Sequence, residues 1–198
     1  IASGSASISG ANDVITADSP TVVIDWVPND MTGTAPIDFL PSTNSVLFQN
    51  GSVVTDFTVL NRITPSDGNL DVLTRVIELN GTITSRIGSN PGGNVWFYTP
   101  GGFLVGGTAI VDVGGLVLST SVIDDSPLLG GITNPINFTG TPTPDSRITI
   151  DSGASITAAN YVAMVAPRIE QGGNVNVDGS IAYVAAKHGI AGLTKTAA

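Results

Sequence analysis

Hydrophobic and polar side chains alternate along much of the chain, in short runs that glycine and proline interrupt. Between residues 72 and 120, for example, Ile77, Leu79 and Ile83 alternate with polar residues, and the run continues through Gly81. A period of two residues is typical of a strand with one buried face. Nothing in this stretch has the spacing of a helix. The pattern predicts an all-β fold of short strands that turn repeatedly.

The same alternation predicts strands over most of the remaining sequence. These runs cover residues 21–27, 37–40, 45–49, 57–63, 94–99, 103–105, 109–113, 116–120, 147–157, 161–165 and 174–181. Residues 1–20 have weaker alternation and are expected to form a first, capping strand or to stay loose. Residues 124–146 contain four prolines and several glycines, so we expect a long loop or an excursion from the fold there.

A local pattern recurs, in which Asn or Asp and Gly are flanked by apolar residues. It occurs at 79–83 and 177–181, with looser copies at 49–53 and 151–156. The spacing between copies is irregular, on the order of 20–30 residues between some of them, within the range expected of β-solenoids with loops. An Asn-Gly pair also suits an antiparallel hairpin, and therefore a sandwich. Because the apolar positions keep their phase through the glycine, the solenoid is the favoured interpretation.

Composition restricts the classes of protein that the chain can belong to. Its 198 residues are 41% hydrophobic and 12% charged, with a net charge of −9 and no cysteine. Disorder is not expected, because it requires low hydrophobicity and high charge. A nucleic-acid binder needs a basic stripe, and the sequence has none. No uninterrupted apolar run reaches the roughly 18 residues of a transmembrane helix.

Charge also divides the chain near its C-terminus. Residues 1–182 contain five arginines, no lysine, no histidine and all 16 acidic residues, a balance of −11. The last 16 residues contain Lys187, His188 and Lys195 and no acid. We therefore expect a main domain at 1–182 and an atypical tail at 183–198, acting as a short helical cap or a foreign segment.

From about Val22 to Ala186 the sequence resembles the N-terminal domain of filamentous haemagglutinins, the two-partner secretion domain of large exported adhesins. The resemblance is carried by segments in the same order, at 59–64, 79–83, 94–106, 113–117, 161–167 and 179–185. It implies a right-handed parallel β-helix that is not an enzyme, needs no cofactor or metal and starts a much longer adhesin. The implied partner is an outer-membrane β-barrel transporter with periplasmic recognition modules. The full adhesin is expected to bind a host or surface glycan.

The resemblance also implies a location and contact residues. The domain would pass through the periplasm, after removal of a signal peptide, and reach the bacterial cell surface. The Asn-Arg pair of the family matches Asn61 and Arg62. Its Asn-Pro-Asn-Gly type of turn corresponds to Thr99, Pro100, Gly101 and Gly102, with Thr and Gly in place of both asparagines. These six residues are the candidate transporter contacts.

Residues 182–198 have a second, conflicting resemblance, to the active-site helix of short-chain dehydrogenases. Tyr183 and Lys187 have that family's Tyr-x-x-x-Lys spacing, in which Tyr is the acid/base and Lys lowers its pKa. The glycine-rich nucleotide motif and the alternation of strands and helices are missing from the sequence. A dehydrogenase fragment is therefore the least favoured hypothesis.

Other candidate chemistry is sparse. Asp124 and Asp125 form the densest acidic pair, and paired carboxylates would suit a carbohydrate-active β-helix enzyme, although a solvated turn is the simpler interpretation. Trp96 and Tyr98 form a candidate surface aromatic contact if their neighbours point inward, and the alternative is packing beneath residues 124–146. His188 is the only histidine. No metal or cofactor site is predicted.

Overall fold

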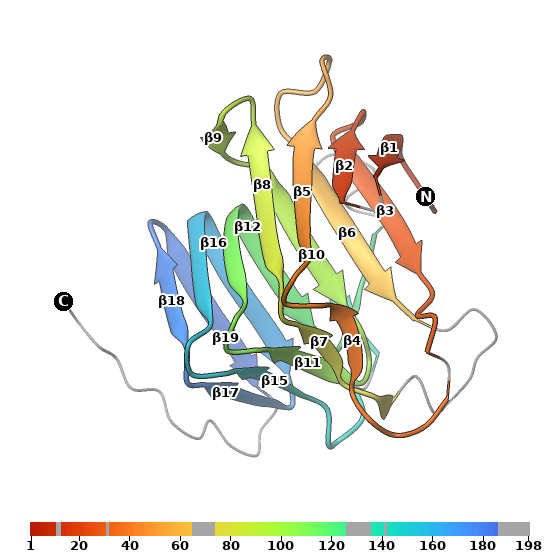
Figure 1. Ribbon diagram of the computed structural model, residues 1–198, viewed down its shortest axis with the longest axis vertical. Helices are drawn as coiled ribbons and strands as arrows, with labels where there is room; N and C mark the ends of the chain where they lie inside the picture. Colours follow the sequence, from red (N-terminus) through yellow and green to blue (C-terminus); the bar gives the residue numbers. More distant parts are fainter. Residues whose placement is uncertain (11–12, 31, 65–73, 126–135, 141, 186–198) are drawn as a thin grey trace.

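The fold consists of short strands gathered into two main sheets (Figure 1). The computed structural model describes residues 1–10, 13–30, 32–64, 74–125, 136–140 and 142–185. None of the elements described there is a helix. The prediction of an all-β fold is confirmed.

In chain order, the strands are β1 (Ala6–Ser9), β2 (Val14–Ala17), β3 (Thr21–Trp26), β4 (Ile37–Leu40), β5 (Ser45–Asn50), β6 (Thr58–Ile63), β7 (Ile77–Leu79), β8 (Thr82–Ile87), β9 (Asn90–Pro91), β10 (Asn94–Tyr98), β11 (Gly102–Val105), β12 (Ile110–Ser119), β13 (Val122–Ile123), β14 (Phe138–Thr139), β15 (Arg147–Ile150), β16 (Ser155–Ala166), β17 (Arg168–Gln171), β18 (Asn174–Val177) and β19 (Ser180–Ala185).

Most strands pair in parallel, in three columns. One column is β2, β5, β8, β12, β16 and β18, and a second is β3, β6, β10, β12, β16 and β19. The long strands β12 and β16 belong to both, because their first halves pair in one column and their second halves in the other. The third column, the smaller sheet, is β4, β7, β11, β15 and β17.

The chain visits the three columns in turn and then moves up by one strand. We call each such set of strands a layer, so that β2, β3 and β4 form the first layer and β5, β6 and β7 the second. Each layer pairs in parallel with the one before it. The antiparallel pairs are local additions: β1 with β2, β8 with β9, and β13 with β14. The β1–β2 pair supplies the capping strand expected near the N-terminus.

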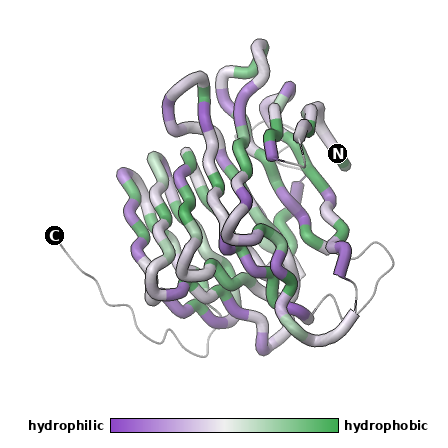
Figure 2. Tube along the Cα trace, in the orientation of Figure 1, coloured by the Kyte–Doolittle hydropathy of each residue, from purple (hydrophilic) through white to green (hydrophobic). Residues whose placement is uncertain are grey.

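Aliphatic side chains are in register from layer to layer and form the core. In the second column Val22, Val59, Val95, Leu116 and Val162 are aligned, and each is at most 1% exposed. Figure 2 shows the alternation of hydrophobic and hydrophilic positions along these strands. Burying one such side chain contributes about 1.5–3 kcal/mol, so the repeated register is a principal source of stability.

The recurring Asn/Asp-Gly pattern marks corners between strands. Leu79 ends β7 in the smaller sheet, and Ile83 lies in β8 of the larger sheet, with both side chains buried. A Cβ at Gly81 would lie 2.4 Å from the carbonyl oxygen of Asn44 in the layer below, so the corner needs glycine. The chain changes sheet while its apolar residues stay inside, which explains why the alternation keeps its phase through the glycine.

Two predicted segments lie partly outside the described residues. In the proline-rich stretch 124–146, residues 124–125, 136–140 and 142–146 are described, and there β14 pairs with β13. Tyr183 and Ala185, placed in the atypical tail by the sequence analysis, belong to β19 and pair with β16. The predicted helical cap lies in residues 186–198, outside the described residues.

Candidate functional site

Asn61, a predicted transporter contact, is a buried side chain that joins three strands. It lies in β6 and is 1% exposed. Its Oδ1 accepts a hydrogen bond from Trp26 Nε1 in β3 at 2.9 Å, and its Nδ2 donates to the carbonyl oxygen of Trp96 in β10 at 3.2 Å. Both ends of the amide therefore have partners inside the protein. Asn61 also borders the cavity described below, but its amide already makes its hydrogen bonds within the protein.

Arg62, the next residue, points outward and binds two carboxylates. Its Nε and Nη2 donate to the two oxygens of Asp25 at 2.6 and 3.2 Å, and its Nη1 donates to Asp125 at 3.1 Å. The hydrogen bond with Asp25 raises the pKa of Arg62, as does the charge of both acids. About 29% of the side chain is exposed. Arg62 thus connects β3 and β6 to the start of the proline-rich stretch and remains accessible.

The turn from Thr99 to Gly102 is packed between layers. A Cβ at Gly101 would lie 2.0 Å from the carbonyl oxygen of Arg75, and one at Gly102 would lie 2.3 Å from that of Arg147. Gly102 also has a φ of 108°, a conformation that favours glycine. Thr99 is 1% exposed, whereas Pro100 is partly exposed. In the folded domain this turn offers Pro100 to a partner and keeps the other three residues inside.

The structure corrects the prediction of an exposed aromatic pair at Trp96 and Tyr98. Val95 and Phe97 do point inward, but Trp96 is only 1% exposed. It packs in a second apolar cluster on the other face of the sheet, which contains Val23, Leu60, Val117 and Ile123, with Ile136 against it. The alternative, packing beneath residues 124–146, agrees with the position of Trp96, because Ile123, next to that stretch, and Ile136, within it, belong to the same cluster. The sequence analysis missed the burial of Trp96, because the residues that cover it, Ile123 and Ile136, lie far from it in sequence.

Trp96 and Tyr98 also differ in their polar surroundings. Trp96 Nε1 donates to the hydroxyl of Tyr161 at 2.8 Å, and burial raises the pKa of Tyr161 to about 12. Tyr98 is half-buried in register with Arg62. Burial raises the pKa of Tyr98, and the charge of Arg62 acts in the opposite direction. Of the predicted pair, only Tyr98 can contribute to a surface.

The residues proposed for the enzyme alternatives are not gathered into a centre in the described structure. Asp125 is paired with Arg62, a cation 63 positions away that its sequence neighbours did not reveal. Among the described residues, no group of three or more acidic or histidine side chains is placed to hold a metal ion. Tyr183 lies in a strand, not on a helix, and its hydroxyl donates to the side chain of Gln171. Lys187 and His188 lie outside the described residues.

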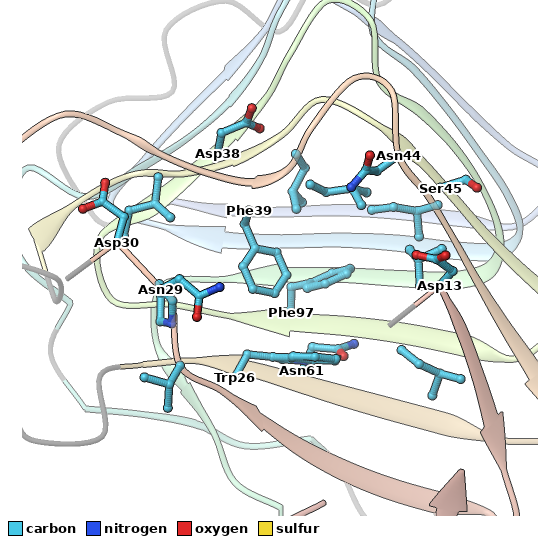
Figure 3. Close-up of a pocket in the computed structure, with 18 of the residues that line it drawn as sticks. Asp13, Trp26, Asn29, Asp30, Asp38, Phe39, Asn44, Ser45, Asn61 and Phe97 are labelled. Atoms are coloured by element: carbon cyan, nitrogen blue, oxygen red, sulfur yellow. The ribbon is translucent and has the colours of Figure 1, made fainter. Parts of the chain in front are cut away.

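A cavity of about 570 Å³ lies at the end of the stack that carries the first layer, β2, β3 and β4 (Figure 3). This volume is within the range of small-molecule and side-chain pockets. Its apolar wall includes core residues such as Ile15, Phe48 and Phe97. Trp26 and Phe39 line it as an edge-to-face pair, with ring centroids 5.9 Å apart. The cavity therefore borders the hydrophobic core, whose side chains in its wall remain buried; we call this feature the end cavity.

The margin of the end cavity is polar and acidic. Asp13, Asp30 and Asp38 line it, and no Lys, Arg or His is among the lining residues that the structure describes. Asp38 accepts a hydrogen bond from Asn80 Nδ2 at 3.2 Å. Among the described residues, neither Asp13 nor Asp38 takes part in an ion pair. In its described part, the margin therefore places acidic side chains next to an apolar wall, with Asp30 in an ion pair with Arg75.

Arg75, which the sequence analysis did not single out, holds part of this margin in place through Asp30. Its side chain is 2% exposed, and it donates to Asp30 Oδ2 at 2.6 Å. It also donates to the carbonyl oxygens of Asp30, Thr32 and Ala35 at 2.6–3.2 Å. The hydrogen bond from Arg75 lowers the pKa of Asp30. Arg75 thus holds the connection between β3 and β4 in place. Its partners lie at least 40 positions away, so the sequence alone gives no local signal for this role.

Comparison with known proteins assigns no family to the chain, because no family model matches it and a search of curated proteins found no match. None of the described segments forms a helix with the length and hydrophobicity that crossing a bilayer requires.

Proposed function

We propose that this chain is the secretion and folding-nucleation domain at the start of a large exported filamentous adhesin, and that its layers wind as a right-handed parallel β-helix. The observation that carries the proposal is the parallel stacking of successive layers in three columns, with aliphatic side chains in register. Such stacking agrees with what the haemagglutinin-type motifs imply. It also suits nucleation, because each layer buries its apolar residues only against its neighbours.

The right hand of the winding is supported by a general rule of chain connection. Consecutive strands of each column are parallel and are joined by a crossover that passes through the other two columns. Crossovers between parallel strands of one sheet are right-handed in about 98% of cases. The twist of the strands favours that hand, so the same hand is proposed for every layer.

The proposed partner is an outer-membrane β-barrel transporter that captures the domain through periplasmic modules, before the adhesin reaches the cell surface. On the folded domain, the accessible part of the predicted contact set is Arg62 and Pro100, with Tyr98 beside Arg62. Asn61, Thr99, Gly101 and Gly102 become available only when the layers open. Capture of the folded domain therefore depends on Arg62, Pro100 and Tyr98. Capture of an unfolded chain depends on all six predicted contact residues.

Co-purification with the transporter's periplasmic modules tests the proposal. We expect the chain to be retained, and Arg62→Ala to reduce retention about tenfold, because a charged contact near the centre of an interface contributes on that order. Arg168→Ala is the matched control, since Arg168 is also an arginine in a surface ion pair, with Glu170, on a different column. It should leave retention unchanged.

Two results would count against different parts of the proposal. If the unsubstituted chain is not retained and is not exported with its transporter, the assignment as a secretion domain is wrong. If the chain is retained but alanine at Asn61 and Arg62 changes neither capture nor export, the function stands and the assignment of those contacts is wrong.

A further inference from the structure

The sequence contains two Asn-Gly pairs, and both lie at corners of the second layer. Asn50 ends β5 and is followed by Gly51, whereas Asn80 and Gly81 connect β7 to β8. In an unfolded chain, an asparagine before glycine is especially prone to deamidation, because glycine has no side chain to hinder attack by its own backbone nitrogen. The two corners are therefore candidate sites of spontaneous chemical modification.

The reaction needs only the chain and water. The backbone nitrogen of the glycine loses its proton and bonds to the carbonyl carbon of the asparagine side chain. The bond from that carbon to Nδ2 breaks, and Nδ2 leaves with the proton as ammonia, so that a cyclic succinimide remains. Water then opens the ring at either of its carbonyl groups. One product is aspartate, and the other is isoaspartate, in which the main chain runs through the former side chain and is one carbon longer.

In the folded protein, both attacking nitrogens are already hydrogen-bond donors to the first layer. The N–H of Gly51 donates to the carbonyl oxygen of Ala17 at 2.7 Å, and the N–H of Gly81 donates to that of Leu40 at 3.0 Å. Neither nitrogen can lose its proton and turn toward the preceding side chain while it keeps this contact. The reaction therefore requires the corner to open first.

The amides that would be attacked are held as well. Nδ2 of Asn50 donates to the carbonyl oxygen of Val54 at 2.7 Å. Nδ2 of Asn80 donates to Asp38 at 3.2 Å and to Glu78 at 3.3 Å. The fold thus restrains both reacting groups at each corner.

The products fit the corner at Asn80 poorly. A Cβ at Gly81 would lie 2.4 Å from the carbonyl oxygen of Asn44 and 2.6 Å from that of Pro41, so the main chain here has no room for the extra carbon of isoaspartate. Aspartate at position 80 keeps the normal main chain. It would, however, place a third carboxylate where the amide now donates to Asp38 and Glu78, and like charges repel.

We propose that Asn50 and Asn80 are deamidation sites that docking of the second layer on the first keeps closed, and that a chain converted to isoaspartate at Asn80 before folding no longer closes this corner. The reaction runs in one direction, because the ammonia is lost to the solvent. The two corners therefore limit the time for which the chain can stay unfolded and still fold.

Deamidation rates of the full chain, folded in buffer or unfolded in urea at pH 8, test the first part. Protease digestion and mass spectrometry locate the modified residues. Each corner should react at least about tenfold more slowly in the folded chain, because only the opened fraction reacts. Asn174, exposed and followed by Val175, is the internal control and should stay unmodified in both states on the same time scale.

A peptide of residues 77–85, measured in buffer and in urea, corrects for the effect of urea on the chemistry. After this correction, equal rates in the folded and unfolded chain would overturn the proposal, because the hydrogen bonds to the first layer would then give no protection. Rapid reaction at Asn174 would also contradict it, since the reaction would not depend on the following glycine.

Pulse proteolysis of chains aged in urea tests the second part. The aged chains are brought to the urea concentration at which half of the unmodified chains fold, and a brief protease treatment removes the unfolded ones. Isoaspartate at position 80 should be depleted at least about fivefold among the survivors, because added volume against packed backbone destabilises the fold. Equal survival of modified and unmodified chains would refute this part.

An Asn80→Asp variant separates charge from main-chain length. It adds the carboxylate without the extra carbon, so its survival in the same assay should fall less than that of the isoaspartate form. A loss as large as that of the isoaspartate form would overturn the argument from the longer main chain.

Discussion

Replacing Asn61 by alanine is expected to destabilise the domain by removing an amide that joins three strands. The substitution takes away the acceptor of the Trp26 Nε1 hydrogen bond, 2.9 Å long, and the donor to the carbonyl of Trp96. A donor left without a partner in a partly buried site costs about 1–3 kcal/mol. Loss of the buried side-chain atoms adds on the order of 1 kcal/mol. The expected decrease in the free energy of unfolding is therefore about 2–4 kcal/mol.

Urea denaturation followed by far-ultraviolet circular dichroism measures this decrease without relying on tryptophan signals. Asn176→Ala is the matched control, because Asn176 is exposed on β18, and it should change the free energy of unfolding by no more than about 0.5 kcal/mol.

A double-mutant cycle separates the hydrogen bond from the loss of packing. Trp26→Phe removes the indole donor, so Asn61→Ala in that background should cost about 1 kcal/mol less than in the unsubstituted chain. If the two substitutions are additive, or if Asn61→Ala behaves like the exposed control, the amide does not join the strands energetically. In that case the reasoning from these contacts is wrong.

Two further predictions concern the packing of layers and the response to alkaline pH. Gly101→Ala should lower the free energy of unfolding by about 2 kcal/mol or more, because its Cβ would lie 2.0 Å from a backbone oxygen. Gly172→Ala is the control: its nearest neighbouring atom would be 3.3 Å away, so this substitution should cost less than about 1 kcal/mol. Thermal unfolding of both variants measures the difference. Burial raises the pKa of Tyr161 to about 12 in the folded protein, above its ordinary value near 10. As the pH rises, the unfolded chain therefore loses this proton first. The free energy of unfolding should fall by about 2–3 kcal/mol between pH 10 and 12. Urea denaturation at pH 8, 10 and 11 should show a smaller decline for Tyr161→Phe, and an equal decline would contradict the assignment.

Much of the fold follows from the alternation of side chains, because the strands are short and each has one buried face. The run through Leu79 and Ile83 predicted strands at the correct positions, and its unbroken phase favoured stacking over a hairpin. The division of that run at Gly81 was not predicted, because both strands bury the same alternate positions although they belong to different sheets. A corner that keeps the apolar phase has the same periodicity as a continuous strand.

The candidate site was less predictable, because its decisive contacts join residues far apart in sequence. The sequence singled out the Asn-Arg pair at 61–62, but alternation alone did not reveal that Asn61 points inward among three strands while Arg62 points outward. Trp96 is on the outer face of β10, as the alternation indicates, and only the remote Ile123 and Ile136 show that this face is covered. The end cavity is formed by side chains from several strands and by a connection between β3 and β4. Arg75 holds that connection, and it lies 40 positions after Ala35, so no local pattern predicts the cavity.

The parallel register has a consequence for a chain that emerges with its N-terminus first. Val59 pairs with Val22, 37 positions upstream, Val162 with Leu116, 46 upstream, and Ile181 with Val162, 19 upstream. From the second layer on, each described parallel strand of the three columns therefore has a partner strand earlier in the chain. If the chain is exported as proposed, folding could therefore advance from the first layer onward, and each added layer would oppose backward movement of the chain without an external source of energy.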